Sequence, residues 1–423
     1  MPRRRRLFGT DGVRGVVGAD LTPELVERLG RAATVWSGRG RVFVGRDTRA
    51  SGPELEQALV RGVVSAGGSV VLGGVLPTPA VALLALDLGV VVSASHNPPE
   101  YNGIKLFDRD GAKLSDAAEE EIEGLLDAPP RGEPGTVDEL EMVDESYSEH
   151  LIERFGSDLS DLRIAVDCAN GAYSEIAPAT LRQLGAEVTA LADRPDGTNI
   201  NVGCGATDLS LLQSTVRAGG YDLGVAFDGD GDRMLAVDAT GEPVDGDGIL
   251  AVLALHLEVE LVAVTTMTNL GFHRLMEEHG IRVVTTDVGD RYVLEALRRE
   301  GGVLGGEQSG HILYLRGHVT GDGLAAALLL CGALAGRTLA EAAGVLVRLP
   351  QRKQNVRAER GGVPQAVLEE VARLNAELAG RGRVLVRASG TEPLVRVLAE
   401  GESAAHAEDL CATLSALVSR ELG

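Results

Sequence analysis

A strand–loop–helix pattern occurs four times along the chain, and it constrains the fold more than any other feature of the sequence. In each copy an apolar, β-branched run leads into a polar or glycine-rich loop, and a helical pattern follows. The four runs with their loops cover residues 41–49, 163–171, 261–269 and 383–391. Short apolar runs that alternate with helices are typical of βαβ units and of mixed or parallel sheets.

The first three copies are alike and the fourth differs. A second strand follows the helix in the first three copies, at residues 69–72, 187–191 and 282–285, whereas in the fourth the helix comes much later, at 405–422. The chain has 423 residues, and a single core stops growing beyond roughly 250–300 residues. We therefore predict an α/β protein with three similar α/β domains with mixed sheets and a smaller α+β C-terminal domain. The expected domains cover residues 1–155, 156–245, 246–350 and 351–423.

Charge and cysteine usage narrow the class of protein. The formal net charge is −22, which argues against nucleic acid and anionic membranes as partners. An anionic substrate would need a local cationic pocket. The chain shows no apolar run of about 20 residues and no signal-peptide pattern. The four cysteines lie far apart without a C-x-x-C pair, as in a reducing compartment, so we expect a cytoplasmic protein.

A candidate nucleophile lies at the end of the apolar run at residues 90–92. Ser95 is followed by His96 and Asn97, and Pro98 and Pro99 prevent a helix from starting there. A hydroxyl on a rigid loop at a strand end is well placed for covalent chemistry. A Ser/Asn turn that only satisfies backbone groups is the alternative.

A candidate metal site follows the apolar run at residues 223–227. Asp228, Asp230 and Asp232 alternate with glycines, and three carboxylates so close together would repel one another without a cation. Oxygen ligands without Cys or His suit Mg²⁺ or Ca²⁺. An EF-hand would need Gly and Glu at the sixth and twelfth positions of the loop, where this chain has Arg233 and Ala239. Arg233 suits a phosphate oxygen or a structural ion pair.

Three further loops carry side chains that could bind a phosphorylated sugar. Residues 305–311 offer a carboxylate, an amide, a hydroxyl and an imidazole for sugar hydroxyls or an amine, although a polar turn would look similar. Residues 387–396 form a candidate phosphate nest, or an exposed loop with incidental arginines. Residues 8–15 form either a substrate-facing loop or a structural turn. The residues concerned are Glu307, Ser309 and His311 in the first loop, Arg387, Ser389, Gly390, Thr391 and Arg396 in the second, and Arg14 in the third.

In these loops the chain resembles the α-D-phosphohexomutase family over essentially its full length. The Ser-Ala-Ser-His-Asn-Pro, Asp-Gly-Asp-Gly-Asp-Arg, Gly-Glu-x-Ser-Gly-His and Arg-x-Ser-Gly-Thr-Glu-Pro loops occur in the order that the family shows. Residues 8–15 and 288–293 look most like the bacterial branch that acts on an amino sugar. Many relatives carry a lysine before the second stretch, where this chain has Asp287, so no cationic role is expected there.

The resemblance implies four domains around a central cleft and a role for each loop. It makes Ser95 the phosphorylated residue and the three aspartates, together with a phosphoserine oxygen, the Mg²⁺ ligands. It assigns Glu307 and Ser309 to sugar hydroxyls and the nest to the distal phosphate. The implied reaction interconverts glucosamine 6-phosphate and glucosamine 1-phosphate, with glucosamine 1,6-bisphosphate as intermediate and activator.

Two roles and several alternatives stay open at this point. Arg14 and Lys105 are expected to offset the charge of the phosphoserine, and either Lys105 or His96 could move protons. A phosphomannomutase or phosphoglucomutase would use the same site. A non-catalytic phosphosugar-binding protein would dispense with Ser95 or a metal carboxylate, and a metal-dependent phosphatase would release phosphate. The expected partner is a phosphosugar, and the expected assembly a monomer or homodimer.

Overall fold

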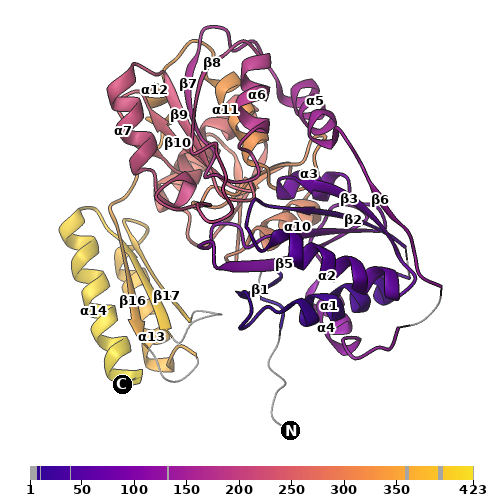
Figure 1. Ribbon diagram of the computed structural model, residues 1–423. Coiled ribbons are helices and arrows are strands. Elements are labelled where there is room, and N and C mark those ends of the chain that lie inside the picture. The colour runs from indigo at the N-terminus through magenta and orange to yellow at the C-terminus, as the bar shows by residue number, and fades with distance from the viewer. Residues whose placement is uncertain are drawn as a thin grey trace. The chain divides into compact units, whose positions relative to one another are not determined.

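The computed structural model describes residues 7–9, 11–38, 40–130, 133–357, 362–388 and 394–422. Among these residues it shows four β-sheets of six, five, four and three strands, each flanked by helices (Figure 1). The chain divides into two compact units. The larger unit comprises residues 1–266 and 284–343, and the smaller unit comprises residues 267–283 and 344–423.

The first sheet has the strand order β1-β5-β4-β2-β3-β6. Its strands are β1 (Val13–Val16), β2 (Arg41–Arg46), β3 (Ser69–Val75), β4 (Leu88–Val92), β5 (Tyr101–Asp108) and β6 (Val137–Glu139). The helices of this region are α1 (Pro23–Trp36), α2 (Gly52–Ser65), α3 (Thr78–Leu83), α4 (Asp116–Gly124) and α5 (Val143–Phe155). Strands β2, β3 and β4 are parallel, whereas β5 runs antiparallel to both β4 and β1.

Alternation along β2 decides which helices cover the first sheet. Val42 and Val44 belong to the same buried cluster as residues of α1 and α2, whereas a Cβ on Gly45 would touch Val81 of α3. Successive side chains of a strand point to opposite faces, so α1 and α2 cover one face and α3 the other (Figure 1). At the end of α1, the Trp36 indole N–H donates to Glu121 of α4 at 2.8 Å.

The second sheet has the order β11-β10-β9-β7-β8. Its strands are β7 (Arg163–Asp167), β8 (Glu187–Leu191), β9 (Leu223–Phe227), β10 (Met234–Asp238) and β11 (Pro243–Val244), accompanied by α6 (Ile176–Gln183), the 3₁₀ turn η1 (Gly205–Thr207) and α7 (Ser210–Gly219). Leu212 and Val216 of α7 pack against Ala165, Ala226 and Val237 of the sheet.

The third sheet has the order β13-β12-β14-β15. Its strands are β12 (Leu261–Thr265), β13 (Arg282–Thr286), β14 (Leu304–Gly306) and β15 (Ile312–Tyr314), and the helices nearby in sequence are α8 (Gly246–His256), α9 (Leu270–Glu278), α10 (Asp290–Glu300), α11 (Gly323–Leu334) and α12 (Leu339–Ala343). α8 and α11 are apolar on nearly all sides because both are buried. No helix within the described residues is long and apolar enough to cross a membrane.

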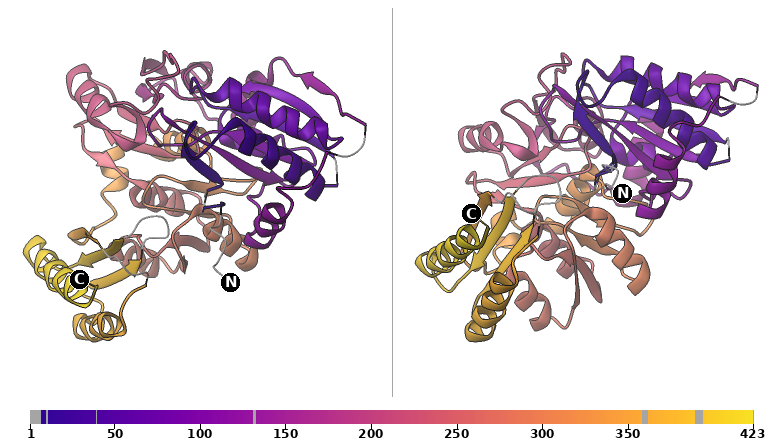
Figure 2. Two further views of the ribbon diagram at one scale, coloured as in Figure 1. Left: turned by 60° about the horizontal axis from the view of Figure 1, so that its bottom comes forward. Right: turned by 90° about the horizontal axis from the view of Figure 1, so that it is seen from below.

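The smaller unit is built on the sheet β16-β18-β17. Its elements are β16 (Gln351–Arg357), β17 (Arg383–Ala388), β18 (Leu394–Glu400), α13 (Gln365–Leu378) and α14 (Ala404–Leu422), and α9 belongs to the same unit. α13 and α14 lie side by side on one face of this sheet (Figure 2), where Val384, Val395 and Val397 form the core with Leu374 and Leu414. Asn269, just before α9, exchanges two hydrogen bonds with the backbone of Leu349, at 3.0 Å each.

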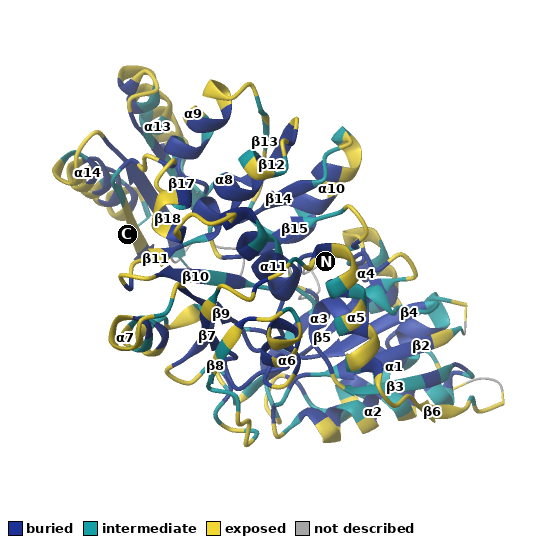
Figure 3. Cartoon of the chain, turned by 90° about the horizontal axis from the view of Figure 1, so that it is seen from above, coloured by how far each residue is buried: buried dark blue, intermediate teal, exposed yellow. Residues whose placement is uncertain are grey.

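The structure confirms the predicted fold class and the repeated strand–helix units. Burial follows this layering, with buried strands and exposed outer faces on helices such as α7 and α14 (Figure 3). The loops at residues 93–100, 228–233 and 307–311 join the antiparallel pairs β4–β5, β9–β10 and β14–β15. The predicted domain boundaries and the common cleft stay predictions.

Candidate active site

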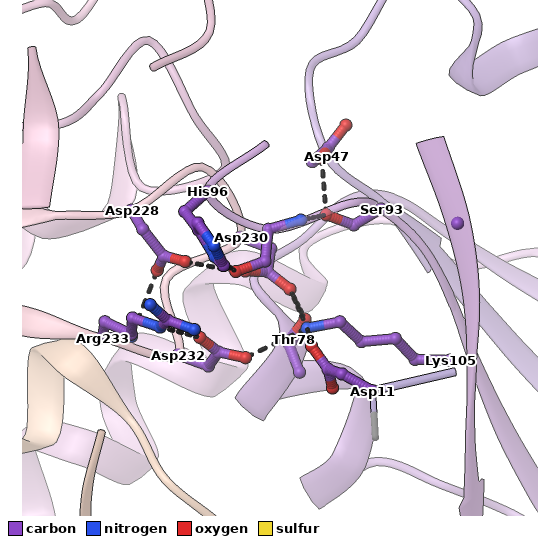
Figure 4. Close-up of polar contacts among 12 residues, drawn as sticks. Asp11, Asp47, Thr78, Ser93, His96, Lys105, Asp228, Asp230, Asp232 and Arg233 are labelled. Carbon is purple, nitrogen blue, oxygen red and sulfur yellow. Dashed lines mark hydrogen bonds and ion pairs between the residues drawn. The ribbon is translucent and has the colours of Figure 1, made fainter. Parts of the chain in front are cut away.

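The hairpin loops of the first three sheets meet in the larger unit. Loop 93–100 contributes Ser95, loop 228–233 contributes the three aspartates, and the antiparallel bridge between Arg233 and His311 joins the second loop to the third. Figure 4 shows the three aspartates together with Lys105 and Arg233, their side chains pointing toward one another. The predicted residues Ser95, Lys105, Arg233 and His311 therefore lie around the aspartates.

Ser95 is fully buried and has a left-handed backbone conformation, with φ of +53°. For a residue other than glycine such a conformation costs of order 1–3 kcal/mol and persists only when the surroundings enforce it. Its Oγ donates to Asp228 Oδ2 at 2.5 Å and lies 3.2 Å from His96 Nδ1. The hydroxyl thus points at the acidic loop between β9 and β10.

Asp228, Asp230 and Asp232 form a compact buried cluster. One oxygen from each lies within 4.8 Å of the others, and Gly231 between them has φ of +76°, which glycine adopts readily. Asp230 Oδ1 is buried and has no hydrogen-bond partner among the described residues. A buried carboxylate oxygen without a partner is costly, so a hard cation with oxygen ligands fits this cluster.

The electrostatics of the cluster support the same interpretation. Burial, followed by the charges of Asp232 and Asp230, raises the pKa of Asp228 to about 7. Burial acts in the same direction on Asp232, but Lys105 and His311 hold the pKa of that carboxyl well below its usual range. The charge of Asp228 is therefore compensated less well by the protein than the charge of Asp232.

Lys105, on β5, is the main protein cation at the cluster. Its Nζ donates to Asp230 Oδ2 at 2.6 Å and to Asp232 Oδ2 at 3.0 Å, and lies 3.3 Å from Asp11 Oδ2. Burial opposes its charge, but these three carboxylates raise the pKa of Lys105 well above its usual value. Thr78, the first residue of α3, also donates to Asp230.

Burial and the cations near Ser95 leave His96 uncharged. Burial, followed by the charges of Arg233 and Arg14, lowers the pKa of His96 to about 3. Arg233 donates its backbone N–H to Asp228 Oδ1 at 3.1 Å. Arg14 pairs with Asp11, and its buried Nε has no hydrogen-bond partner in the part of the chain that the structure describes. Arg14, His96 and Arg233 are thus a suitable environment for the oxygens of a phosphate near Ser95.

His311 links the third loop to the acidic cluster. Its Nδ1 lies 2.8 Å from Glu307 Oε2 and its Nε2 lies 3.0 Å from Asp232 Oδ1. Burial alone would lower the pKa of His311, but Asp232 raises it to about 10, so both ring nitrogens carry protons and donate. Glu307 Oε1 also accepts the backbone N–H of Gly289 at 3.1 Å, whereas Ser309 in the same loop is exposed.

The sequence analysis did not predict the ion pairs that join residues 11–116 to Asp290 and Arg291 at the start of α10. Lys113 Nζ lies 2.6 Å from Asp11 Oδ1 and 2.8 Å from Asp290 Oδ2. Arg291 donates to the Leu114 carbonyl at 2.9 Å and pairs with Asp116. Residues 8–15 were singled out as a substrate-facing loop or a structural turn, and residues 288–293 for their resemblance. The acidic and basic residues in both stretches were the available signal for these ion pairs.

The smaller unit holds the predicted phosphate residues that the structure describes. Arg387 of β17 and Arg396 of β18 are directly paired across the sheet. They line a pocket of about 350 Å³ together with Lys353 and Asn355 of β16 and the apolar side chains of Met267, Leu385, Val397 and Leu398. Ser389, Gly390 and Thr391 lie outside the described residues.

Family models match consecutive parts of the chain. The descriptions are phosphoglucomutase/phosphomannomutase α/β/α domain I for residues 5–131, domain II for 145–241, domain III for 245–349, and the C-terminal domain for 340–417.

Individual proteins match over the full length. Phosphoglucosamine mutase of Symbiobacterium thermophilum is 48% identical, covering 99% of both chains, and that of Moorella thermoacetica is 49% identical, covering 98% of this chain and 99% of its own. A phosphoglucomutase/phosphomannomutase family protein of Burkholderia thailandensis has a similar structure, with a TM-score of 0.85 at 25% identity and 98% coverage of both chains. N-acetylphosphoglucosamine mutase of Aspergillus fumigatus, solved with GlcNAc-6P and magnesium, shares the fold with a TM-score of 0.75 at 21% identity, covering 100% of this chain and 97% of its own.

Proposed function

The chain belongs to the phosphoglucomutase/phosphomannomutase family of α-D-phosphohexomutases, and on that premise we propose that it interconverts glucosamine 6-phosphate and glucosamine 1-phosphate. The choice of amino sugar is supported by full-length relatives at 48–49% identity that are phosphoglucosamine mutases. Such an isomerase would supply the precursor of UDP-N-acetylglucosamine. A phosphomannomutase or phosphoglucomutase is the alternative.

One observation carries the proposed chemistry. The buried Ser95 hydroxyl donates to Asp228 inside a cluster of three aspartates, and Asp230 keeps an oxygen without a protein partner. Asp228, Asp230 and Asp232, with an oxygen of phosphorylated Ser95, would hold Mg²⁺. When bound there, Mg²⁺ neutralises charge on the phosphoryl group that is transferred.

The residues of the chain then have distinct roles in two transfers. In the first, the bond from Ser95 Oγ to phosphorus breaks while a substrate hydroxyl oxygen bonds to the same phosphorus and loses its proton. This gives glucosamine 1,6-bisphosphate. In the second, Ser95 Oγ takes the phosphoryl group from the other end of the sugar. Each transfer needs mainly alignment and charge stabilisation, which we assign to Arg14, Lys105 and Arg233.

The remaining assignments concern protons and the sugar. His96 is uncharged and close to Ser95 Oγ, whereas Lys105 is held protonated by carboxylates. We therefore assign proton movement at Ser95 to His96. Glu307 and Ser309 are assigned to sugar hydroxyls, with His311 orienting Glu307, and Arg387, Ser389, Gly390, Thr391 and Arg396 to the distal phosphate. Cytoplasmic location and a monomeric or dimeric state stay predictions.

The test compares turnover of glucosamine 6-phosphate, glucose 6-phosphate and mannose 6-phosphate with Mg²⁺ and a trace of sugar 1,6-bisphosphate. We expect a preference for the amino sugar. A preference for glucose or mannose phosphate would change only the substrate that we assign, and not the proposed reaction.

A second test concerns Ser95 itself. Ser95→Ala should remove the phosphoryl group that intact-mass measurement detects and nearly all turnover, while Ser148→Ala, on α5, should keep both. Residual turnover above about one hundredth, equivalent to a loss of less than about 2.7 kcal/mol, would rule out Ser95 as the carrier. Release of inorganic phosphate instead of a sugar 1-phosphate would indicate a phosphatase.

A further inference from the structure

Arg49 is buried against the main chain of the Ser95 loop, and all five of its guanidinium N–H groups donate hydrogen bonds. It is only 1% exposed. Nε donates to Asp47 Oδ2 at 2.9 Å. Nη1 donates to the carbonyls of Pro98 and Tyr101 at 2.5 and 2.9 Å, and Nη2 to those of Ser95 and Asn97 at 2.9 and 2.8 Å. One side chain therefore holds four carbonyl groups within seven residues of the loop.

Asp47 completes this arrangement on the other side of Ser95. It neutralises Arg49 and accepts the Ser93 hydroxyl at 2.5 Å, as Figure 4 shows. The Ser93 Oγ in turn accepts the backbone N–H of Ser95 at 2.9 Å. Both backbone polar groups of Ser95 are thus fixed, the N–H through Ser93 and the carbonyl through Arg49.

A second donor reaches the same carbonyls from the second domain. Asn201 Nδ2 donates to the carbonyls of Ser95 and Asn97 at 2.9 and 3.2 Å. Asn201 has φ of +59°. Its loop also contacts the residues beside Arg49, because the Ala50 N–H donates to the Gly197 carbonyl at 2.9 Å.

We infer that Arg49 and Asn201 are positioning residues for phosphoryl transfer, holding the main chain of Ser95 left-handed so that Oγ points at Asp228. The inference rests on the proposed function of Ser95 as the phosphoryl carrier. Neither side chain contacts Oγ, so each acts through the backbone of Ser95. Nothing else among the described residues donates a side-chain hydrogen bond to the Ser95 carbonyl.

Lysine cannot replace Arg49 in this role. An ammonium group has three N–H donors, whereas the guanidinium has five in a rigid plane. Arg49→Lys keeps the charge next to Asp47 but must lose at least two of the five hydrogen bonds that the guanidinium makes. The matched control is Arg31→Lys, because Arg31 lies on α1, beside the same sheet, and its side chain bonds only Ser65 and Glu27 among the described residues.

The experiment measures steady-state kinetics, phosphorylation of Ser95 by glucose 1,6-bisphosphate in a single turnover, and amide hydrogen exchange of residues 88–101. For Arg49→Lys we expect kcat and the phosphorylation rate to fall by about 10- to 100-fold, KM to change by less than about threefold, and exchange in the loop to become faster. Arg31→Lys should match the wild type. A folded Arg49→Lys protein with kcat and exchange within about twofold of wild type would overturn the inference.

Asn201→Ala decides the question if Arg49→Lys does not fold, since it removes two hydrogen bonds from a partly exposed side chain. A fall in kcat of about threefold or more with faster hydrogen exchange in the loop supports the inference, and unchanged values overturn it.

Failure of the proposed function would give a different result. In that event the wild type itself would not accept a phosphoryl group on Ser95. The hydrogen exchange of the variants and the wild type would still show whether Arg49 and Asn201 fix the loop.

Discussion

At the scale of single residues, Asp230 shows most clearly how the site is divided between protein and ligand. Its Oδ2 accepts from Lys105 and Thr78, whereas its Oδ1 accepts no hydrogen bond from any residue that the structure describes. An asparagine could keep the first set of contacts with its carbonyl oxygen. The amide NH2 group of the asparagine would then take the place of Oδ1. An uncharged N–H donor does not ligate a hard cation, so the substitution would weaken the cation site.

Asp230→Asn should therefore reduce Mg²⁺ affinity without unfolding the protein. We expect the Mg²⁺ concentration for half-maximal turnover to rise by about 10- to 100-fold, which corresponds to about 1.4–2.7 kcal/mol. Direct titration with Mn²⁺, followed by electron paramagnetic resonance, should show the same loss. Asp238→Asn is the control, because this buried carboxylate accepts from Thr240 and Glu242 and is outside the cluster. An unchanged Mg²⁺ response would remove Asp230 from the metal site.

Residues adjacent in sequence could be predicted, and residues brought together only by folding could not. The three aspartates form a short motif, and the polar residues around Ser95 are consecutive. Thr78 meets Asp230 across 152 positions and Asn201 meets Ser95 across 106 positions. Arg49 had a partial signal, since Asp47 and Arg49 directly follow the strand β2. Four of its five partners are backbone carbonyls, however, and these cannot be recognised from a pattern of side chains.

At the scale of elements, the first turn of α11 supports the acidic loop from behind. Asp322 caps the helix by accepting the Ala325 N–H at 2.9 Å, and it also accepts the hydroxyls of Tyr147 and Tyr173. The Gly323 N–H donates to the Gly231 carbonyl at 2.9 Å. A Cβ on Gly231 would lie 2.4 Å from the Tyr173 ring, so this ring limits the conformations open to the loop.

Asp322→Ala should destabilise the protein more than the loss of an ordinary helix cap. It removes a cap and leaves two buried tyrosine hydroxyls without their acceptor, so we expect a loss of about 3–5 kcal/mol in the free energy of unfolding and a weaker Mg²⁺ response. Thr22→Ala, which removes only the cap of α1, should cost about 1 kcal/mol. Equal losses in urea unfolding of the two variants would refute the supporting role of Asp322.

The predictability of elements follows from their periodicity. Parallel strands buried on both faces, such as β9 and β12, are continuous apolar runs, and the helix α9 after β12 is amphipathic, so these elements were recognised. β5 was not, because it contains Asn102, Lys105 and Asp108 among its apolar residues. The interruption has a functional reason, since Lys105 belongs to the site.

At the scale of the whole molecule, the net charge of −22 works against compactness. Raising KCl from 0.01 to 0.1 M shortens the Debye length from about 30 to about 10 Å and screens repulsion between surface carboxylates more than attraction in buried pairs. We expect the melting temperature of the metal-free protein to rise by about 2–4 °C. An equal osmolarity of glucose should be compared as the uncharged control. A melting temperature that is constant or falls with KCl would show that surface attraction outweighs net repulsion.

The contact between Trp36 and Glu121 determines what optical methods can see in this protein. Trp36 is the only tryptophan in the chain, and it lies where α1 meets α4 in the first domain. Intrinsic indole emission is therefore a local probe. An unfolding curve recorded by fluorescence follows the opening of this one helix pair, whereas circular dichroism averages over helices throughout both units, so disagreement between the two curves would separate the melting of the first domain from that of the rest.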